Sequence, residues 1–368
     1  VDDLKKFQLT AIQKNLGIKS WEEFYKLKIT TKKDLPDSPA ENDFFQHETS
    51  GSTGEPRIIW VPKESWYRKD AIFTRSWDNI GRSKNGKVFR LMAGEPKYAF
   101  YDSLRNVYPH NYRAVDEKTV ESFLNLEPEI IHGPGGAIRQ LCELLISKGH
   151  EESLKKVHIE WCSESSSGHK ERLKPFVAGF HEQYGLAELP TVGSPDGEGN
   201  VRVVMEQGII EILDDNGQEV REGEEGFIVV TDINNTITPI IRYQCGDRGK
   251  IKRYKNQDGL EYFILYDIIG RGVDYYNGPE VKKAIGWSIV SPISHILGDV
   301  IEKWRIEIIP KDHACILYVK FIKNEDYGSL KPYEKWIKDN YGLSCSFKKL
   351  EDEKYDIYFK NKLVRVTL

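Results

Sequence analysis

A hydroxyl- and glycine-rich run at residues 49–54 is the segment of this sequence best suited to bind phosphate. It consists of Thr49, Ser50, Gly51, Ser52, Thr53 and Gly54. Because these small residues let backbone N–H groups approach a polyanion closely, the run could hold the phosphates of a nucleotide. It is not a Walker-type P-loop, which continues into Gly-Lys-Ser/Thr. By composition alone it could also be a surface linker.

Four further segments accompany this run in a fixed order. They are Tyr184-Gly-Leu-Ala-Glu188, Ile241-Arg-Tyr-Gln-Cys-Gly-Asp247, Ile269-Gly-Arg271 and Asn361-Lys-Leu-Val-Arg365. Together with residues 49–56 they resemble the signature set of the adenylate-forming superfamily, which contains acyl-CoA synthetases, peptide-synthetase adenylation domains and luciferases. The segment Ile131-His-Gly133 and the approach to Asp247 most resemble the phenylacetate-CoA ligase and CapK-like branch.

The resemblance implies a binding site for ATP. The run 49–54 would hold the β- and γ-phosphates, Asp247 would accept hydrogen bonds from two ribose hydroxyls, and Tyr184 would flank the adenine. Gly185, next to Tyr184, and the pair Ser163 and Glu164, in the stretch that runs beside the base in relatives, complete the expected nucleotide contacts. From the residues alone, Asp247 could instead cap a turn after Gly246 and Tyr184 could be an ordinary half-buried aromatic.

Three charged residues would carry the chemistry by the same resemblance. The glutamate that matches Glu188 binds Mg²⁺ in relatives, and a hard carboxylate oxygen suits that cation. A lysine near the C-terminus, here Lys362, would stabilise the charge that develops between the acid and the α-phosphate. Arg271 would contact ribose or phosphate. Lys360 is an alternative to Lys362, and each of these side chains could also be a solvated surface charge.

His132, in the Ile-His-Gly segment, has two interpretations of equal weight. It could line the acyl pocket, or it could be a hydrogen-bonded structural histidine. The sequence also departs from the family at Val273, which replaces the acid at the hinge of the small domain, and at Gln244-Cys245, where relatives have Arg-Thr.

Composition narrows the class of protein. The 368 residues carry a net charge of -4 with both signs interspersed, which predicts no nucleic-acid partner and no anionic membrane. The apolar runs are too short to span a bilayer. The five cysteines are scattered, with no Cys-x-x-Cys pair, which predicts a protein of the reducing cytoplasm.

Periodicity predicts both helices and strands. Helical patterns cover residues 4–27, 137–147 and about 167–180, and a short buried strand covers 157–161. Strands at 209–213 and 226–231 are predicted to form a hairpin with a turn at Asn216-Gly217. Beyond residue 270, the sequence predicts strands at 304–309, 314–319 and 354–359 and a helix at 332–341. The fold class expected is therefore α/β, with a large multi-layered adenylation domain of mixed β-sheets at residues 1–270 and a small, mobile α+β domain at 271–368.

The function expected from the resemblance is ATP- and Mg²⁺-dependent activation of a carboxylic acid. The acid would be aromatic or another small organic acid, and the acyl-adenylate would pass its acyl group to coenzyme A. A carrier-protein thiol or an amine are alternative acceptors. Two other classes stay open: a degenerate nucleotide-binding protein that has lost catalysis, and a kinase- or ATPase-like phosphotransferase, which the missing P-loop lysine disfavours.

Overall fold

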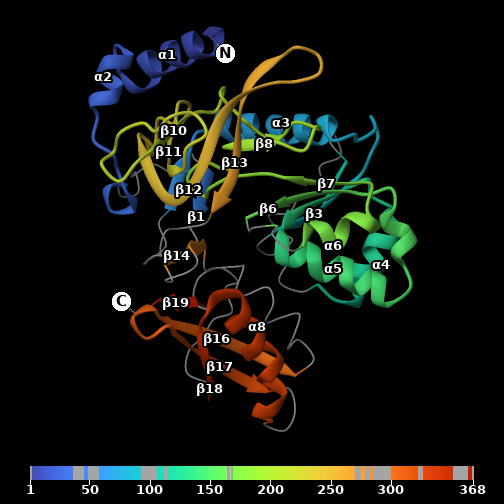
Figure 1. The fold of residues 1–368 in the computed structure, drawn as a ribbon. Coiled ribbons are helices and arrows are strands. Elements are labelled where there is room, and N and C mark those ends of the chain that lie inside the picture. Colours follow the sequence, from blue (N-terminus) through green and yellow to red (C-terminus); the bar gives the residue numbers. More distant parts are fainter. Residues whose placement is uncertain are drawn as a thin grey trace. The chain divides into compact units, whose positions relative to one another are not determined.

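A computed structural model shows how the chain folds. It describes residues 2–35, 45–48, 58–92, 106–111, 115–163, 166, 169–269, 275–277, 282–284, 300–321, 326–350 and 364–366. Two compact units separate along the sequence, one containing the described residues up to Ile268 and the other those from Ile269 onward. Each unit has its own sheets and its own core (Figure 1).

A five-stranded parallel sheet forms one layer of the first unit. Its order is β4 (Val107–Asn111), β3 (Val88–Met92), β5 (Ile130–Pro134), β6 (His158–Cys162) and β7 (Gly179–Glu182). All four strand pairs are parallel. Helices cover both faces, as is usual for parallel sheets. Alternate strand residues point to opposite faces, so Ile131 packs in the cluster with α4 (Glu117–Leu126) and α5 (Gly135–Ser147). Ile130 packs against α3 (Lys63–Asn79) (Figure 1).

The predicted strand at 157–161 and helix at 137–147 are confirmed as β6 and α5. The predicted helix at about 167–180 is wrong. Only α6 (Lys170–Leu173) and the 3-10 turn η4 (Lys174–Phe176) are helical, and β7 begins at Gly179. Pro175 disfavours a longer helix, and Phe180 is needed in the sheet, where it packs with its ring 5.4 Å from that of Trp161. Parallel pairing with β6 therefore overrides the helical periodicity.

A six-stranded sheet forms the second layer of this unit. Its order is β10 (Gly208–Leu213), β11 (Gly226–Asp232), β12 (Tyr243–Lys255), β13 (Glu261–Ile269), β9 (Val201–Val203) and β8 (Gly193–Pro195). The pair β1 (Phe45–Glu48) and β2 (Ile58–Val61) contributes Ile59 and Val61 to the same core. The predicted strands at 209–213 and 226–231 are confirmed as antiparallel neighbours. The turn at Gly217 exists, with φ +75°, but it leads to a bridge between Leu213 and Glu219 rather than directly into β11.

The N-terminal helices pack beside β10 and β11. The single helical pattern over residues 4–27 is two helices, α1 (Asp2–Leu16) and α2 (Trp21–Lys26), followed by the 3-10 turn η1 (Lys32–Asp34). Gly17, with φ +72°, lies at the break, and the Ser20 side chain caps α2. Ile12 and Phe24 pack against Ile209 and Ile233.

The second unit is a four-stranded sheet packed against one helix. Its order is β18 (Ser344–Lys349), β17 (Ala314–Phe321), β16 (Ile301–Ile309) and β19 (Val364–Val366). Tyr333 and Ile337 of α8 (Lys331–Tyr341) pack in one core with Ile306, Leu317 and Val319. The predicted strands at 304–309 and 314–319 and the helix at 332–341 are confirmed, while 354–359 lies outside the described residues. This unit also contains β14 (Tyr275–Asn277), β15 (Lys282–Ala284), η6 (Pro310–Asp312) and η7 (Tyr327–Leu330).

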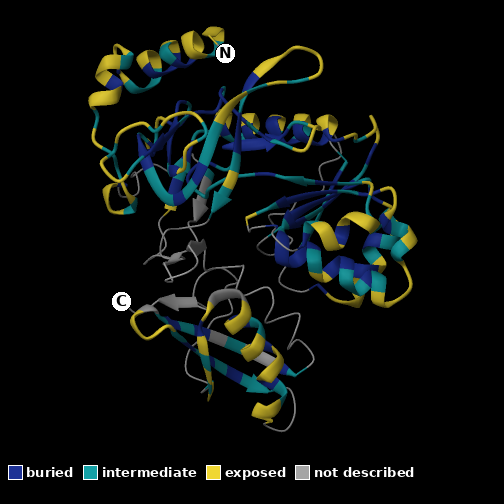
Figure 2. Ribbon diagram, in the orientation of Figure 1, coloured by how far each residue is buried: buried dark blue, intermediate teal, exposed yellow. Residues whose placement is uncertain are grey.

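Burial follows these layers. Figure 2 shows buried residues concentrated in the sheets and on the helix faces packed against them, with exposed residues along the outer faces. Within the part of the chain that the structure describes, no helix is both long enough and apolar enough to cross a membrane. The parallel sheet, the antiparallel pairs and the helices packed on them confirm the expected α/β fold class with mixed sheets.

Candidate active site

The loop between β7 and β8 contains three of the predicted site residues, Tyr184, Gly185 and Glu188. Tyr184 is tied to Gly193 by a pair of backbone hydrogen bonds of 3.0 and 2.9 Å, which fixes the start of the loop. Gly185 is required by space, because a Cβ at this position would lie 2.0 Å from the carbonyl oxygen of Pro190. The glycine therefore allows the loop to fold back on itself, and Glu188, midway along the loop, is buried.

A bulge in β12 places the fourth predicted residue, Asp247. Phe227 of β11 pairs with Arg248 and Val229 pairs with Gln244, so Ile228 lies opposite the three residues 245–247. Gly246 supplies the backbone conformation for this bulge, with φ +93°. Bulges redirect side chains and are frequent beside active sites. The sequence that resembles a nucleotide-binding motif is thus also the sequence that interrupts the sheet.

Two hydrogen bonds between a tyrosine hydroxyl and a carboxylate join the loop to β12. The Tyr184 hydroxyl donates to Asp247 Oδ2 at 2.8 Å. In the opposite direction, the Tyr243 hydroxyl on β12 donates to Glu188 Oε1 at 2.7 Å. The structure therefore brings Tyr184, Gly185, Glu188 and Asp247 together. Tyr243 was not singled out from the sequence, although it lies inside the Ile241–Asp247 segment.

Burial sets the protonation states of Tyr184 and Cys245 in this site. Burial, the Asp247 carboxylate and Cys245 raise the pKa of Tyr184 well above its ordinary value. Tyr184 is therefore a neutral donor at physiological pH. Burial also raises the pKa of the Cys245 thiol, which donates to the Ile228 carbonyl at 3.4 Å. Cys245 is consequently a neutral packing residue of the bulge rather than a nucleophile.

The carboxylate oxygens of Asp247 and Glu188 suit the binding of a nucleotide with its metal. Asp247 offers carboxylate oxygens of the kind that accept from vicinal hydroxyls. Tyr243 occupies Oε1 of Glu188, and Oε2 has no hydrogen-bond partner among the residues that the structure describes. One carboxylate together with substrate phosphates is a usual arrangement for Mg²⁺. Within the described ranges, no group of three or more His, Cys, Asp or Glu residues forms a metal site of its own.

Ser163 is not hydrogen-bonded to this group. It follows the carboxyl end of β6, is exposed, and has a left-handed backbone with φ +70°. It makes no hydrogen bond to Tyr184, Glu188 or Asp247, all of which are described. Its position beside the base stays a prediction.

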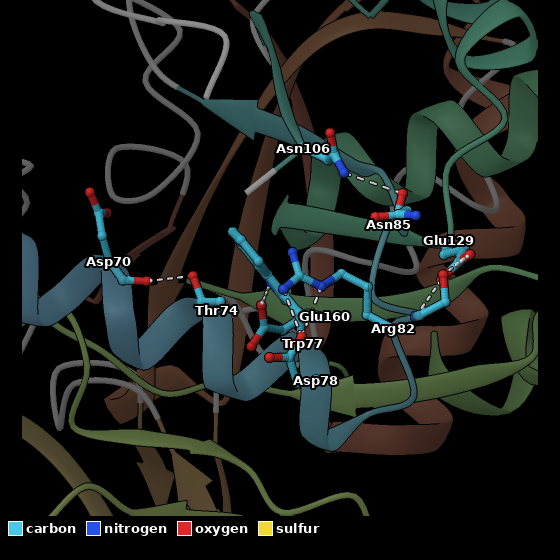
Figure 3. A network of polar contacts seen from close by, with 10 residues as sticks. Asp70, Thr74, Trp77, Asp78, Arg82, Asn85, Asn106, Glu129 and Glu160 are labelled. Carbon is cyan, nitrogen blue, oxygen red and sulfur yellow. Dashed lines mark hydrogen bonds and ion pairs between the residues drawn. The ribbon is translucent and has the colours of Figure 1, made fainter. Parts of the chain in front are cut away.

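His132 is part of a buried polar network on the parallel sheet. Its Nδ1 lies 2.5 Å from Glu160 Oε2 on the neighbouring strand β6. Glu160 also accepts from Trp77 Nε1 on α3 at 2.7 Å (Figure 3). It accepts from the Ser76 hydroxyl on the same helix as well. A structural histidine was one of the two interpretations of the sequence, and these contacts support it. A role in the acyl pocket stays a prediction.

The network belongs to a row of ionisable side chains across the sheet. Arg90, His132, Glu160 and His181 are register partners on β3, β5, β6 and β7. Burial raises the pKa of Glu160, but the bond from His132 and those from Ser76 and Trp77 outweigh burial and lower it below its ordinary value. Burial lowers the pKa of His132, against the opposing effect of Glu160. We therefore assign an ionised Glu160 and a neutral His132 that donates from Nδ1.

Glu160 is a second residue of this kind that was not singled out from the sequence. A glutamate within the predicted buried strand 157–161 indicates a buried carboxylate with dedicated donors.

Other predicted site residues lie outside the described part of the chain. They are Thr49, Ser50, Gly51, Ser52, Thr53, Gly54, Glu164, Arg271 and Lys362, together with the alternative Lys360 and the hinge position Val273.

Comparison with known proteins relates this fold to adenylate-forming enzymes. No protein-family model matches the chain. Protein CapK of Staphylococcus aureus is 21% identical over 343 residues, covering 87% of this chain and 72% of that protein. A 2-hydroxyisobutyryl-CoA ligase structure, in the postadenylation state with 2-HIB-AMP, has a TM-score of 0.72 at 16% identity, with 99% of this chain and 88% of that one covered. For o-succinylbenzoate CoA synthetase from Bacillus subtilis the TM-score is 0.58 at 17% identity, with 86% and 67% covered. At these identities the likeness establishes the fold, and it confirms the predicted resemblance at that level.

Replacing Glu160 tests the buried network. Glu160→Gln keeps the shape of the side chain but removes its charge and places an NH₂ group against donors. Hydrogen bonds to charged groups contribute about 1.5–3 kcal/mol each, so we expect the free energy of unfolding to fall by at least about 2 kcal/mol in urea denaturation. Glu22→Gln is the control, because Glu22 pairs with Lys26 on the surface and such pairs contribute about 0–1 kcal/mol. Equal stability of the two variants would contradict the network.

The paired histidines of β6 and β7 predict acid sensitivity. His158 Nδ1 and His181 Nε2 lie 3.2 Å apart, and burial, followed by the His158 charge, lowers the pKa of His181 to about 4. A lowered folded-state pKa stabilises the fold above the unfolded value near 6.5, and this contribution is lost as the pH falls toward 4. We therefore expect the decrease in Tm between pH 7.5 and 5 to be smaller in His181→Gln than in the wild type. His150→Gln, at an exposed position, should leave the decrease unchanged. An unchanged pH dependence in His181→Gln would show that this histidine does not titrate with unfolding.

Proposed function

We propose that this chain, which has the fold of the adenylate-forming CoA ligases, activates a small carboxylic acid with ATP. In the first step a carboxylate oxygen of the acid bonds to the α-phosphorus and the bond to pyrophosphate breaks. In the second, a thiol sulfur bonds to the acyl carbon, the thiol proton is lost, and AMP leaves with the electrons of its bond. The observation that carries this proposal is the crossed pair of tyrosine–carboxylate hydrogen bonds at Glu188 and Asp247.

Asp247 and Tyr184 would hold the nucleoside. The Asp247 carboxylate would accept from the ribose hydroxyls while Tyr184 holds its Oδ2 oxygen in place. Because burial keeps Tyr184 protonated, it orients the carboxylate without adding a second negative charge to the site. The arrangement supports a preformed ribose site, which reduces the ordering that binding would otherwise require.

Glu188 would hold Mg²⁺ beside the phosphates. Its Oε1 oxygen accepts from Tyr243, so the carboxylate is fixed before the cation arrives. When bound, Mg²⁺ would supply charge neutralisation for the phosphates. In the same proposal the run 49–54 contacts the β- and γ-phosphates, Arg271 contacts ribose or phosphate, and Lys362 contacts the reacting carboxylate and α-phosphate.

The acid and the acceptor are the finer parts of the proposal. We propose an aromatic or other small organic acid, in line with the acids in the names of the similar structures, 2-hydroxyisobutyrate and o-succinylbenzoate. Coenzyme A is the proposed acceptor, and a carrier-protein thiol or an amine are the alternatives. We propose a cytoplasmic location on the basis of the five free thiols.

A pyrophosphate-release assay over a panel of carboxylic acids tests adenylation. With ATP, Mg²⁺ and a suitable acid we expect pyrophosphate release, and a hydroxamate when hydroxylamine traps the adenylate. Asp247→Asn should raise the KM for ATP at least tenfold, which corresponds to about 1.4 kcal/mol. Asp215→Asn is the control, because the Asp215 side chain is 85% exposed. ATP binding without pyrophosphate release for any acid would favour a degenerate nucleotide-binding protein.

Substitution of the two C-terminal lysines tests the catalytic assignment. Lys362→Ala should lower the rate of adenylation about a hundredfold or more, because it removes a charge that stabilises the transition state. Thioester formation from added acyl-adenylate should change much less. Lys360→Ala is the matched control. If the losses were reversed between the two variants, Lys360 would be the catalytic lysine.

A further inference from the structure

Arg242 has an unusual backbone conformation for its position. It is 6% exposed, yet its φ is +43°, in the left-handed region that bulky residues rarely occupy. Such a conformation is unfavourable and persists only where surrounding contacts hold it. It occurs immediately before Tyr243, the donor to Glu188, and five residues before Asp247.

The guanidinium of Arg242 supplies such contacts. Its Nε and Nη2 bind the two carboxylate oxygens of Glu211 at 3.1 and 2.8 Å. Its Nη1 donates to the carbonyl oxygens of Tyr25 and Leu27 at 2.9 and 2.7 Å. The side chain therefore links β10 to the chain that leaves α2. A planar fork that serves a carboxylate and two carbonyls at once is specific to arginine.

The segment from the end of α2 to Thr30, residues 25–30, is bound to the same part of β12 along its backbone. We call it the N-terminal strap. Thr30 N–H donates to the Arg242 carbonyl at 2.9 Å, and Gln244 N–H donates to the Thr30 carbonyl at 2.9 Å. The Thr30 hydroxyl also donates to the Ile241 carbonyl at 2.7 Å. The strap thus adds one parallel bridge, Thr30 to Tyr243, at the start of β12.

These contacts fix residues 241–244 directly ahead of the bulge that places Asp247. Arg242 N–H is held from the other side by the Thr231 hydroxyl at 2.8 Å. Binding groups must be held within about half an ångström to keep their affinity. A small displacement at Arg242 would move the Tyr243 hydroxyl away from Glu188 and change the direction of Asp247.

We infer that Arg242 is a positioning residue for nucleotide binding, and that through it the N-terminal strap is part of the nucleotide site without touching the nucleotide. This inference rests on the proposed function, because it assumes that Asp247 and Glu188 bind ATP with its metal. It assigns a functional role to a region, residues 25–30, that contains none of the family-like motifs.

The test is titration of the full-length protein with ATP and Mg²⁺ by isothermal calorimetry. Arg242→Lys keeps the charge but loses the fork, and we expect its Kd for ATP to rise at least tenfold. In the pyrophosphate assay the KM for ATP should rise similarly, while the KM for the acid should stay within about twofold. Arg82→Lys is the matched control, since the side chains of Arg82 and Arg242 are both 7% exposed and Arg82 pairs with Asp78 in a different layer.

A milder variant keeps the inference testable if Arg242→Lys does not fold. Thr30→Val removes only the hydroxyl bond to Ile241 and should raise the Kd for ATP about threefold or more with circular dichroism unchanged. If folded Arg242→Lys and Thr30→Val both bind ATP with wild-type affinity, the inference is overturned. If Arg242→Lys does not fold, the Thr30→Val titration decides alone. Wild-type protein that binds ATP but releases no pyrophosphate overturns the proposed function and not this inference, whereas wild-type protein that does not bind ATP overturns both.

Discussion

Burial of the two carboxylates Glu188 and Asp247 is the constraint on which the rest of the site depends. A buried carboxylate is costly unless donors satisfy it. Here each carboxylate receives the hydroxyl of a tyrosine that comes from the opposite segment. The loop after β7 and the bulge of β12 therefore hold each other in place. In the proposed function, the same two carboxylates would bind the nucleotide and its metal, so the hydrogen bonds that hold the loop and the bulge together would also orient the ligand-binding groups.

The two layers of the first unit contribute in different ways. The parallel sheet carries a row of ionisable residues whose two central members, His132 and Glu160, are buried, and Glu160 is satisfied by donors from α3 and from His132. Such fully bonded networks make a core rigid. The six-stranded sheet instead is interrupted at residues 245–247, where a strand gives up regular pairing to present Asp247. The parallel sheet is therefore rigid, while the bulge in the six-stranded sheet positions Asp247. A rigid scaffold of this kind helps to keep a binding site preformed.

Sequence patterns predicted the local elements wherever hydrophobic periodicity alone decides the secondary structure. The apolar strand at β6 and the amphipathic helix α5 followed directly from periodicity, as did β16, β17 and α8. The prediction failed over residues 167–180, because a helical pattern there competes with parallel pairing to β6, and pairing over a distance is not visible in a local window. Four predicted site residues, Tyr184, Gly185, Glu188 and Asp247, do come together. His132 instead contacts Glu160, and the position of Ser163 beside the base stays a prediction.

The sequence by itself determined the chemical types and their order: a small-residue run, a tyrosine and a glutamate in one short loop, and an aspartate after a glycine. These are local properties of the chain, and a glycine such as Gly185 or Gly246 already indicates an unusual backbone. Only the tertiary structure decided the partners. That Tyr243 would bind Glu188, that Glu160 would receive donors from α3, and that residues 25–30 would clamp the start of β12 all depend on contacts between segments distant in sequence. No spacing rule encodes such contacts, because burial and packing select them collectively.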